Sequence, residues 1–195
     1  MAKRLYLIAV GFLLALPLTA QSKPSAERPG ISYWVGFSVS TFNPDYGCGS
    51  NSPFTCWNHQ LIGISPYVHT SEFLFGRIGA EGQARFMHWH GPVNLNMDSY
   101  MGGPRVRLWS HKKLAFSGKF VLGIAHISVN PAVDGNYFAF APGAAVDYRV
   151  TRHFSTRLDY EYQMWPSFKG TQTGPGHAGG LTPNGFSVGI SYLVN

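Results

Sequence analysis

Hydrophobic and polar residues alternate along most of the chain with a period of two. The clearest segment is 77–86, where two sets of residues alternate: Ile78, Ala80, Gly82, Ala84 and Phe86 against Arg77, Gly79, Glu81, Gln83 and Arg85. Because successive side chains of a strand point to opposite faces, this alternation predicts β-strands with one apolar and one polar face. Eight such segments occur, at residues 32–41, 62–68, 77–86, 100–108, 114–124, 138–150, 157–164 and 186–194.

The connections between the expected strands alternate between long and short. The long ones are 43–57, 88–98, 128–137 and 165–184, and the short ones are 70–73, 110–113 and 151–153. Strands of about ten residues joined in this way are typical of bacterial barrels that span a membrane. The pattern predicts an all-β fold, an eight-stranded antiparallel up-and-down transmembrane β-barrel with both termini in the periplasm. Pro66, Pro104 and Pro142 are expected at bulges or strand ends, because proline cannot donate to a ladder.

The charged residues within the expected strands all fall on one phase of the alternation. These eleven residues are Arg77, Glu81, Arg85, Arg105, Arg107, Lys119, Asp147, Arg149, Arg157, Asp159 and Glu161. A basic side chain that faces lipid at the middle of a membrane costs ~2–4 kcal/mol, so we expect this phase to line the lumen and to form buried ion pairs. The alternative is a soluble barrel with the apolar face inside, which requires more Phe and Tyr than an eight-stranded lumen can hold.

Aromatic residues occur near both sets of connections. Those near the long connections are Trp57, Trp89 and Trp165, and those near the short ones are Phe73, Trp109, Tyr148 and Phe154. Because aromatic residues are enriched at the two membrane–water interfaces, we expect these residues to form two girdles around the barrel.

The first residues of the chain have a different pattern. Lys3 and Arg4 precede the apolar run 5–16, and small residues follow it. This order is typical of a secretory signal peptide, cleaved after Ala20 or after Ser22. The expected organisation is a signal peptide at 1–22, a periplasmic leader at 23–31 and an outer-membrane barrel at 32–195.

The composition fits an exported membrane protein. The chain is 15% aromatic and 12% charged and has 23 glycines, whereas a secreted soluble β-sandwich normally carries more charge on its wet faces. The formal net charge is +6, but the basic residues form no cluster along the sequence. We therefore expect no nucleic-acid partner, and no cofactor.

Cys48 and Cys56 are the only cysteines, and they lie in a segment rich in Gly, Ser, Asn and Pro. An even number of cysteines in an exported chain predicts a disulfide, which here would close one long connection. A metal site would need further ligands at short spacing.

The last expected strand carries the most specific motif, Ser187-Val-Gly189-Ile-Ser-Tyr192-Leu-Val194. Weaker motifs are Gly102-Gly-Pro104-Arg105, Gly123-Ile-Ala-His126 and Asp159-Tyr-Glu161-Tyr. With these motifs the chain from about Gly30 onward resembles the bacterial outer-membrane β-barrels of the small OmpA- and OmpX-like kind. The resemblance implies an outer-membrane lipid environment, and an assembly signal for the barrel-assembly machinery formed by Ser187, Gly189, Tyr192 and Val194. The chain departs from that family in ending on Val194-Asn195, where an aromatic residue is usual.

The sequence disfavours an enzyme or a metal site. His126 and Ser128 resemble the catalytic pair of the barrel lipid A deacylases, but no Glu occurs between Val129 and Tyr160 to orient the histidine. A barrel protease needs Asp/His and Asp/Asp pairs, which the spacing does not provide among Asp45, Asp98, Asp134, His59, His88 and His90. His88 and His90 also lack a third metal ligand nearby.

The function expected from the sequence is therefore that of a non-enzymatic outer-membrane protein with a structural or surface-interaction role and a lumen filled by side chains. The alternative is a surface adhesion or ligand-binding module that acts through extracellular connections on an extracellular ligand. A lipid A deacylase-like hydrolase is a remote alternative.

Overall fold

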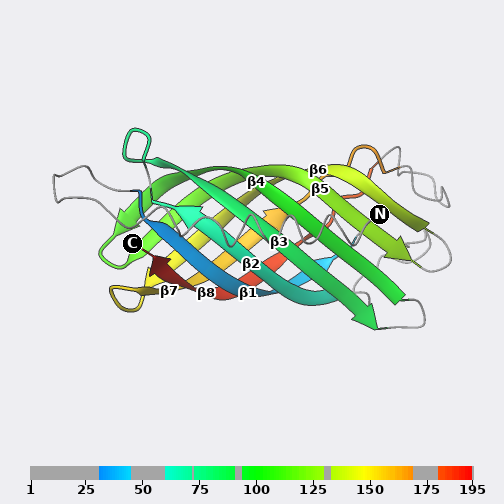
Figure 1. Cartoon of the computed structure of the whole chain (residues 1–195), viewed down its shortest axis with the longest axis horizontal. Coiled ribbons are helices and arrows are strands. Elements are labelled where there is room, and N and C mark those ends of the chain that lie inside the picture. Colours follow the sequence, from blue (N-terminus) through cyan, green and yellow to red (C-terminus); the bar gives the residue numbers. More distant parts are fainter. Residues whose placement is uncertain are drawn as a thin grey trace, which may run out of the picture. The chain divides into compact units, whose positions relative to one another are not determined.

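The computed structural model describes residues 31–44, 60–71, 73–90, 94–129, 133–168 and 180–194, which form eight strands (Figure 1). They are β1 (Tyr33–Asn43), β2 (Leu61–Thr70), β3 (Ile78–His90), β4 (Asn94–His111), β5 (Leu114–Val129), β6 (Val133–Arg149), β7 (Phe154–Tyr162) and β8 (Asn184–Val194). Each strand pairs antiparallel with the next, and β8 pairs with β1, so the sheet is a closed barrel. This confirms the predicted all-β, up-and-down architecture. No helix in the described ranges is long and apolar enough to cross a membrane.

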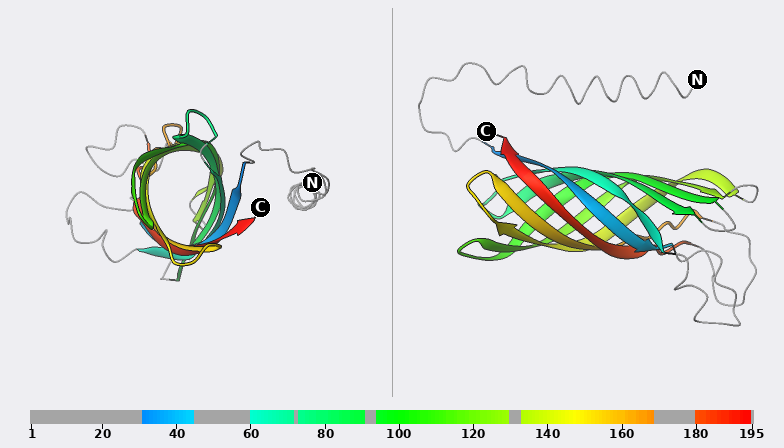
Figure 2. Two further views of the ribbon diagram at one scale, coloured as in Figure 1. Left: turned by 90° about the vertical axis from the view of Figure 1, so that its left-hand side faces the viewer. Right: turned by 90° about the horizontal axis from the view of Figure 1, so that it is seen from below.

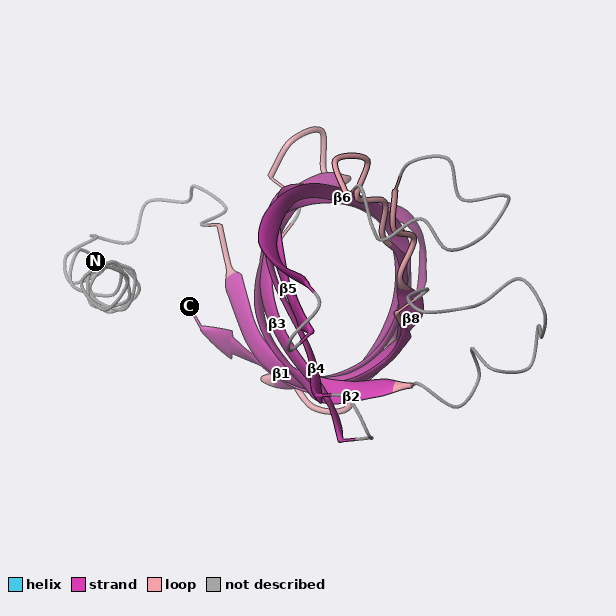
Figure 3. Cartoon of the chain, turned by 90° about the vertical axis from the view of Figure 1, so that its right-hand side faces the viewer, coloured by secondary structure: helices cyan, strands magenta, loops and turns pink. Residues whose placement is uncertain are grey.

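The barrel has two different ends. The start of β1 and the end of β8 pair at one end, where Tyr33 lies opposite Val194. The short connections from β2 to β3, from β4 to β5 and from β6 to β7 belong to the same end. We call it the terminal end, which faces the viewer in the left panel of Figure 2. The opposite end, which we call the hairpin end, faces the viewer in Figure 3.

The four central strands are longer than predicted. β3, β4, β5 and β6 have 13, 18, 16 and 17 residues, and they occupy most of the segments 88–98 and 128–137. Their ladders continue to the pairs His90–Asn94 and Val129–Val133. The prediction of long loops at these two places is therefore wrong.

The prediction fails because the polarity of the two faces reverses toward the hairpin end. Met87, Met97 and Ile127 are buried there, on the phase that carries charged residues nearer the terminal end. Their neighbours His88 and His126 lie on the outward phase. At this end the strands extend the barrel beyond the membrane into water, so polar side chains face outward. Polar residues at these positions therefore do not mark a loop.

Most of the barrel's outer surface is apolar. On β8 the outward residues are 44–61% exposed: Phe186, Val188, Ile190, Tyr192 and Val194. Their neighbours Ser187 and Ser191 are buried inside. An exposed apolar surface that extends around a barrel is unfavourable in water and favourable in lipid. The structure thus has the sidedness of a membrane-spanning barrel, and not that of the soluble alternative.

The three strand prolines each disturb one of their two ladders. Pro66, Pro104 and Pro142 pair with Phe37, Ala80 and Phe120 on one side. On the other side the ladder skips Pro66 and Pro104 and stops short of Pro142. The strands continue through these positions, so the prediction of bulges or strand ends is wrong, although each proline does interrupt a ladder.

The residues predicted to form the girdle at the terminal end face outward, whereas the described residues predicted for the other girdle do not. Phe73, Trp109, Tyr148 and Phe154 are 47–52% exposed. Trp165 is buried, and Trp89 packs against the same buried apolar side chains. The prediction is therefore wrong for these two residues, which turn inward because the lumen is apolar at this height. Trp57 lies outside the described residues.

Candidate functional site

Eight charged side chains meet inside the barrel, in the half nearer the terminal end. We call them the ion cluster, which comprises four acids and four bases: Glu81, Asp147, Asp159 and Glu161 with Arg85, Arg105, Lys119 and Arg157. All are buried except Asp147, which is partly buried. Burying a charge is costly unless it is paired. The equal numbers of acids and bases meet this requirement for the cluster as a whole.

Glu81 on β3 binds three of the four bases. Its Oε1 accepts a hydrogen bond from Lys119 Nζ at 3.1 Å, and its Oε2 accepts from Arg157 Nη1 at 3.0 Å and from Arg105 Nη1 at 3.5 Å. Arg157 and Arg105 also share Asp147, since Arg157 Nε donates to Oδ1 at 2.9 Å and Arg105 Nη2 donates to Oδ2. Two carboxylates thus hold the two guanidinium groups.

Lys119 on β5 connects Glu81 to the remaining acids. Its Nζ donates to Asp159 Oδ2 at 2.6 Å and to Gln83 Oε1 at 3.1 Å, and lies 3.1 Å from Glu161 Oε2. Glu161 in turn accepts from Arg85 Nη1 at 2.6 Å and from Gln83 Nε2 at 2.5 Å. Since nearly every member has two or more partners, removing one charge affects several others.

Two glycines make room for these long side chains. A Cβ on Gly143 of β6 would lie 2.9 Å from Lys119 Cε, so glycine allows the lysine stem to pass. A Cβ on Gly36 of β1 would lie 2.3 Å from Tyr67 Cζ. The Tyr67 ring covers Gly36 and carries the Arg157 guanidinium 4.4 Å from its centre. Backbone, aromatic ring and cation are therefore stacked.

His69 lies beside the cluster toward the terminal end. Arg157 Nη2 donates to His69 Nδ1 at 3.2 Å, because a guanidinium has no acceptor. The Trp34 ring stacks on the histidine with 6.1 Å between ring centres. His69 was not among the predicted lumen residues, although it shares the inward phase of its strand.

The half of the lumen nearer the hairpin end is filled by apolar side chains, which we call the apolar cluster. Its buried members are Phe42, Leu61, Met87, Leu95, Met97, Met101, Val121, Ala125, Ile127, Ala139, Ala141, Trp165, Phe168 and Leu181. Trp165, Phe168 and Leu181 belong to the connection between β7 and β8, where Trp165 and Leu181 form a β-bridge. Both ends of this connection therefore contribute to the filling, which the sequence pattern did not predict.

The two clusters are in direct contact. The Arg85 guanidinium lies 4.2 Å from the centre of the Phe42 ring while it binds Glu161. Gln163 makes a second link, because its Nε2 donates to Glu161 Oε1 at 2.8 Å and its Oε1 accepts from Trp165 Nε1 at 3.0 Å. Cation–π and amide contacts thus join the ionic and apolar layers.

Three of the eleven predicted lumen charges lie outside the ion cluster. Arg77 is exposed in the turn before β3, so its predicted place in the lumen is wrong. The reason is that Leu74 O accepts hydrogen bonds from the backbone N–H groups of Arg77 and Ile78, which closes the turn before the strand begins. Arg107 and Arg149 line a cavity at the terminal end.

The His-x-Ser pair lies on the outward phase of β5 near the hairpin end. His126 Nδ1 is 3.1 Å from Asn136 Oδ1, and His126 Nε2 is 3.9 Å from Asp134 Oδ1. Ser128 Oγ donates to Asp134 Oδ2 at 3.4 Å. Within the described residues no hydrogen bond joins Ser128 to His126, whereas a nucleophilic serine is activated by a base on its hydroxyl. Asp134 and His126 are nevertheless brought together, which their sequence spacing did not suggest.

The other predicted sites are partly outside the described residues. Cys48, Cys56, Asp45 and His59 lie there, so the disulfide stays a prediction. Within the described ranges no three His, Cys, Asp or Glu side chains form a group that could hold a metal ion. Of the predicted assembly signal, Ser187 is buried and Tyr192 and Val194 face outward; its role in assembly stays a prediction.

Comparison with known proteins identifies the fold. No protein-family model matches the sequence, and neither does any curated protein sequence. The solved structure of Neisserial surface protein A matches with a TM-score of 0.59 and 11% identity over 84% of this chain and 98% of that chain. The outer membrane protein OprG from Pseudomonas aeruginosa matches with a TM-score of 0.52 and 10% identity over 85% and 97%. This chain therefore has the eight-stranded barrel fold of outer-membrane proteins.

Proposed function

We propose that this chain is an outer-membrane protein with a structural or surface-interaction role, whose barrel is a membrane anchor and not an open channel or an enzyme. The filling of the lumen carries the proposal. The ion cluster occupies one half and the apolar cluster the other, and most of their side chains are buried. An eight-stranded barrel has an interior just wide enough for side chains, so an ion would have to displace both layers to pass.

The outer surface supports the outer-membrane location. Large apolar side chains face outward on the strands, and an aromatic girdle surrounds the terminal end. A barrel of this sidedness satisfies its backbone within the closed sheet and presents its apolar face to lipid. The fold shared with Neisserial surface protein A and OprG agrees with this location.

The hairpin end supports the surface-interaction role. A membrane-spanning strand needs about ten residues, whereas β3 to β6 have 13 to 18. The additional residues carry polar side chains on their outward phase, such as His88, Asp98 and His126. Two paired hairpins with a polar outside and an apolar inside form a stable surface for contact with an extracellular partner. A role as an adhesion or ligand-binding module would use this same surface.

Fractionation followed by conductance measurement tests the proposal. We expect the mature protein in the outer-membrane fraction, and a shift in its gel mobility when it is not heated. In planar bilayers the purified protein should give no steady unit conductance, because the ion cluster and the apolar cluster block the lumen. A reproducible conductance step, or recovery of the protein in the soluble periplasm, would contradict the proposal.

A further inference from the structure

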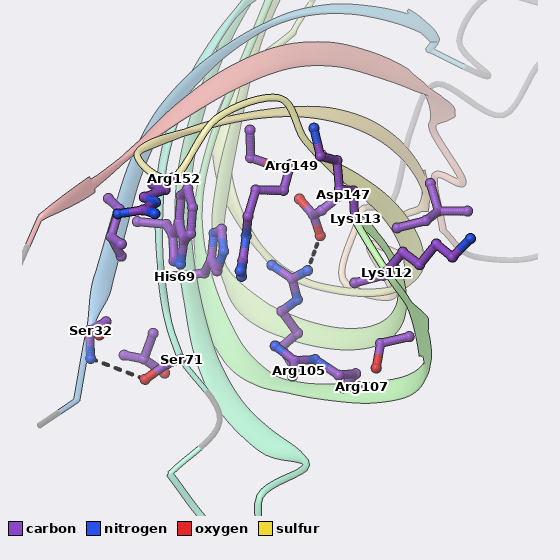
Figure 4. Close-up of a pocket in the computed structure, with 17 residues that line it drawn as sticks. Ser32, His69, Ser71, Arg105, Arg107, Lys112, Lys113, Asp147, Arg149 and Arg152 are labelled. Atoms are coloured by element: carbon purple, nitrogen blue, oxygen red, sulfur yellow. Dashed lines mark hydrogen bonds and ion pairs between the residues drawn. The ribbon is translucent and has the colours of Figure 1, made fainter. Parts of the chain in front are cut away.

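An open cavity of about 350 Å³ lies at the terminal end of the lumen (Figure 4). Its lining includes six basic residues, Arg105, Arg107, Lys112, Lys113, Arg149 and Arg152. Asp147 is the one acidic residue among the described residues that line it. The cavity is therefore strongly basic, whereas the ion cluster beside it has equal numbers of acids and bases.

Asp147 does not neutralise the cavity, because both of its carboxylate oxygens are already engaged. Oδ1 accepts from Arg157 Nε and Oδ2 from Arg105 Nη2, and Figure 4 shows the second of these contacts. Four of the basic residues have no acidic partner: no carboxylate of the described residues forms an ion pair with Lys112, Lys113, Arg149 or Arg152. These four charges remain available to an external anion.

Two of these cations contact neutral groups, and a third lies in a tight turn. The Arg149 guanidinium lies 5.8 Å from the centre of the Trp34 ring, and Lys113 Nζ donates to Val150 O at 3.4 Å. Lys112 has a φ of 51° in the two-residue turn between His111 and Leu114. Glycine adopts this left-handed conformation without strain. The chain instead places a charged side chain there, at the edge of the cavity.

We propose that this cavity binds a phosphate oxyanion. Guanidinium groups donate two parallel hydrogen bonds to phosphate oxygens, and lysine adds a compact positive charge. A recess of one charge sign with low-dielectric walls also raises the local concentration of the opposite ion. The phosphate group comes either from a soluble phosphorylated solute or from the headgroup of an anionic lipid, since both present the same oxyanion. This proposal goes beyond the proposed anchor function and concerns the opposite end of the barrel.

Titration with inorganic pyrophosphate tests the soluble source. The protein, purified from membranes in an uncharged detergent, should bind pyrophosphate saturably in calorimetry, and more weakly as salt is raised. The double variant Arg149→Gln with Arg152→Gln should bind about tenfold more weakly or worse, because it loses two charge-assisted contacts. Arg77→Gln is the matched control, since Arg77 is an exposed cation at a short turn that does not line the cavity. Its affinity should equal that of the wild type. The unheated gel shift verifies that each variant is folded.

Nanodiscs test the lipid source with the same variants. If the phosphate belongs to a lipid, native mass spectrometry should show phosphatidylglycerol retained on wild type and on Arg77→Gln. The double variant should lose it, and phosphatidylcholine should be retained by none of the three. Lipid retention would identify an anionic lipid as the ligand, and pyrophosphate binding without lipid retention would identify a soluble ligand. Either outcome supports the site. The proposal is overturned if wild type binds neither probe, or if Arg77→Gln weakens binding as much as the double variant.

Discussion

The two halves of the lumen are filled by different chemistry although the same strands build both. Along the inward phase of β3, Glu81 and Arg85 belong to the ion cluster and Met87 belongs to the apolar cluster. The outward phase changes in the opposite sense, from the apolar Phe86 to His88. The alternation of the two faces therefore continues along the whole strand. Which face is apolar depends on whether lipid or water surrounds the barrel at that height.

The halves should also differ in how they respond to substitution. In the ion cluster each buried charge depends on particular partners, so the loss of one leaves the others uncompensated. In the apolar cluster contacts are numerous and individually weak, so the loss of one methyl group has a graded cost. Stability measurements on single variants test this difference.

The largest effect is expected for Glu81→Leu in the ion cluster. The substitution leaves Lys119, Arg157 and Arg105 with one carboxylate fewer among them, and removing one partner of a buried ion pair costs about 3–5 kcal/mol. Urea unfolding of the refolded barrel in detergent measures the loss in free energy of unfolding. Ile78→Leu, on the outward phase of the same strand, is the control and should be nearly silent. A neutral Glu81→Leu would show that the cluster does not hold the barrel together.

A smaller effect is expected for Ile127→Val in the apolar cluster. Ile127 is fully buried, and loss of one buried methyl group from an isoleucine typically costs about 0.5–1.5 kcal/mol. Ile124→Val is the matched control, because Ile124 lies on the same strand and is 58% exposed on the outer surface. Its change should be close to zero in the same unfolding experiment. Equal losses in the free energy of unfolding for the two variants would mean that the inward and outward faces of β5 contribute equally to stability, which would contradict the prediction.

The smallest effect on the barrel is expected for the double substitution Cys48→Ser with Cys56→Ser. Both residues lie in the sequence between the end of β1 and the start of β2, and the loop that a disulfide would close there is short, so we expect the unheated gel shift to be unchanged. Free-thiol labelling of the native protein should fail without reductant, because we predict that the two cysteines form a disulfide. Ready labelling, or loss of the folded form in the variant, would assign the cysteines another role.

Much of the fold could be predicted from the sequence because alternation is a local property. Residues such as Ile78 and Phe86 share one face by chain geometry alone, and this gave the strand number, the topology and the lipid-facing phase. Glu81, Arg85 and Lys119 could be placed inside because a charge facing lipid is costly. The same rule placed seven further charged residues inside the barrel: Arg105, Arg107, Asp147, Arg149, Arg157, Asp159 and Glu161. Only Arg77 was misplaced, because it lies in the tight turn before β3 and not in the strand.

The remaining features depend on height along the barrel, which the sequence does not encode locally. His88 and His126 indicate loops only if the outward face of a strand is assumed to be apolar along its whole length. Trp165 has the sequence position of a girdle residue, although it is 1% exposed in the apolar cluster. The basic cavity could not be predicted either. The pairing of β5 with β6 brings Lys112 near Arg149 and Arg152, and the alternation within a single strand does not show which turns and strand ends meet.

The cross-barrel ion pairs constrain the order of assembly. Arg85 and Glu161, and likewise Arg157 and Glu81, join β3 to β7. In a flat sheet these strands would be separated by four spacings, or about 19 Å, which is too far for direct contact. The pairs therefore form only when the sheet curls. A partly assembled sheet in lipid would present unmatched charges together with unpaired strand edges, both of which hydrocarbon disfavours. We therefore expect insertion and closure to be one coupled event, in which the charges of the ion cluster become paired as the last strand meets the first.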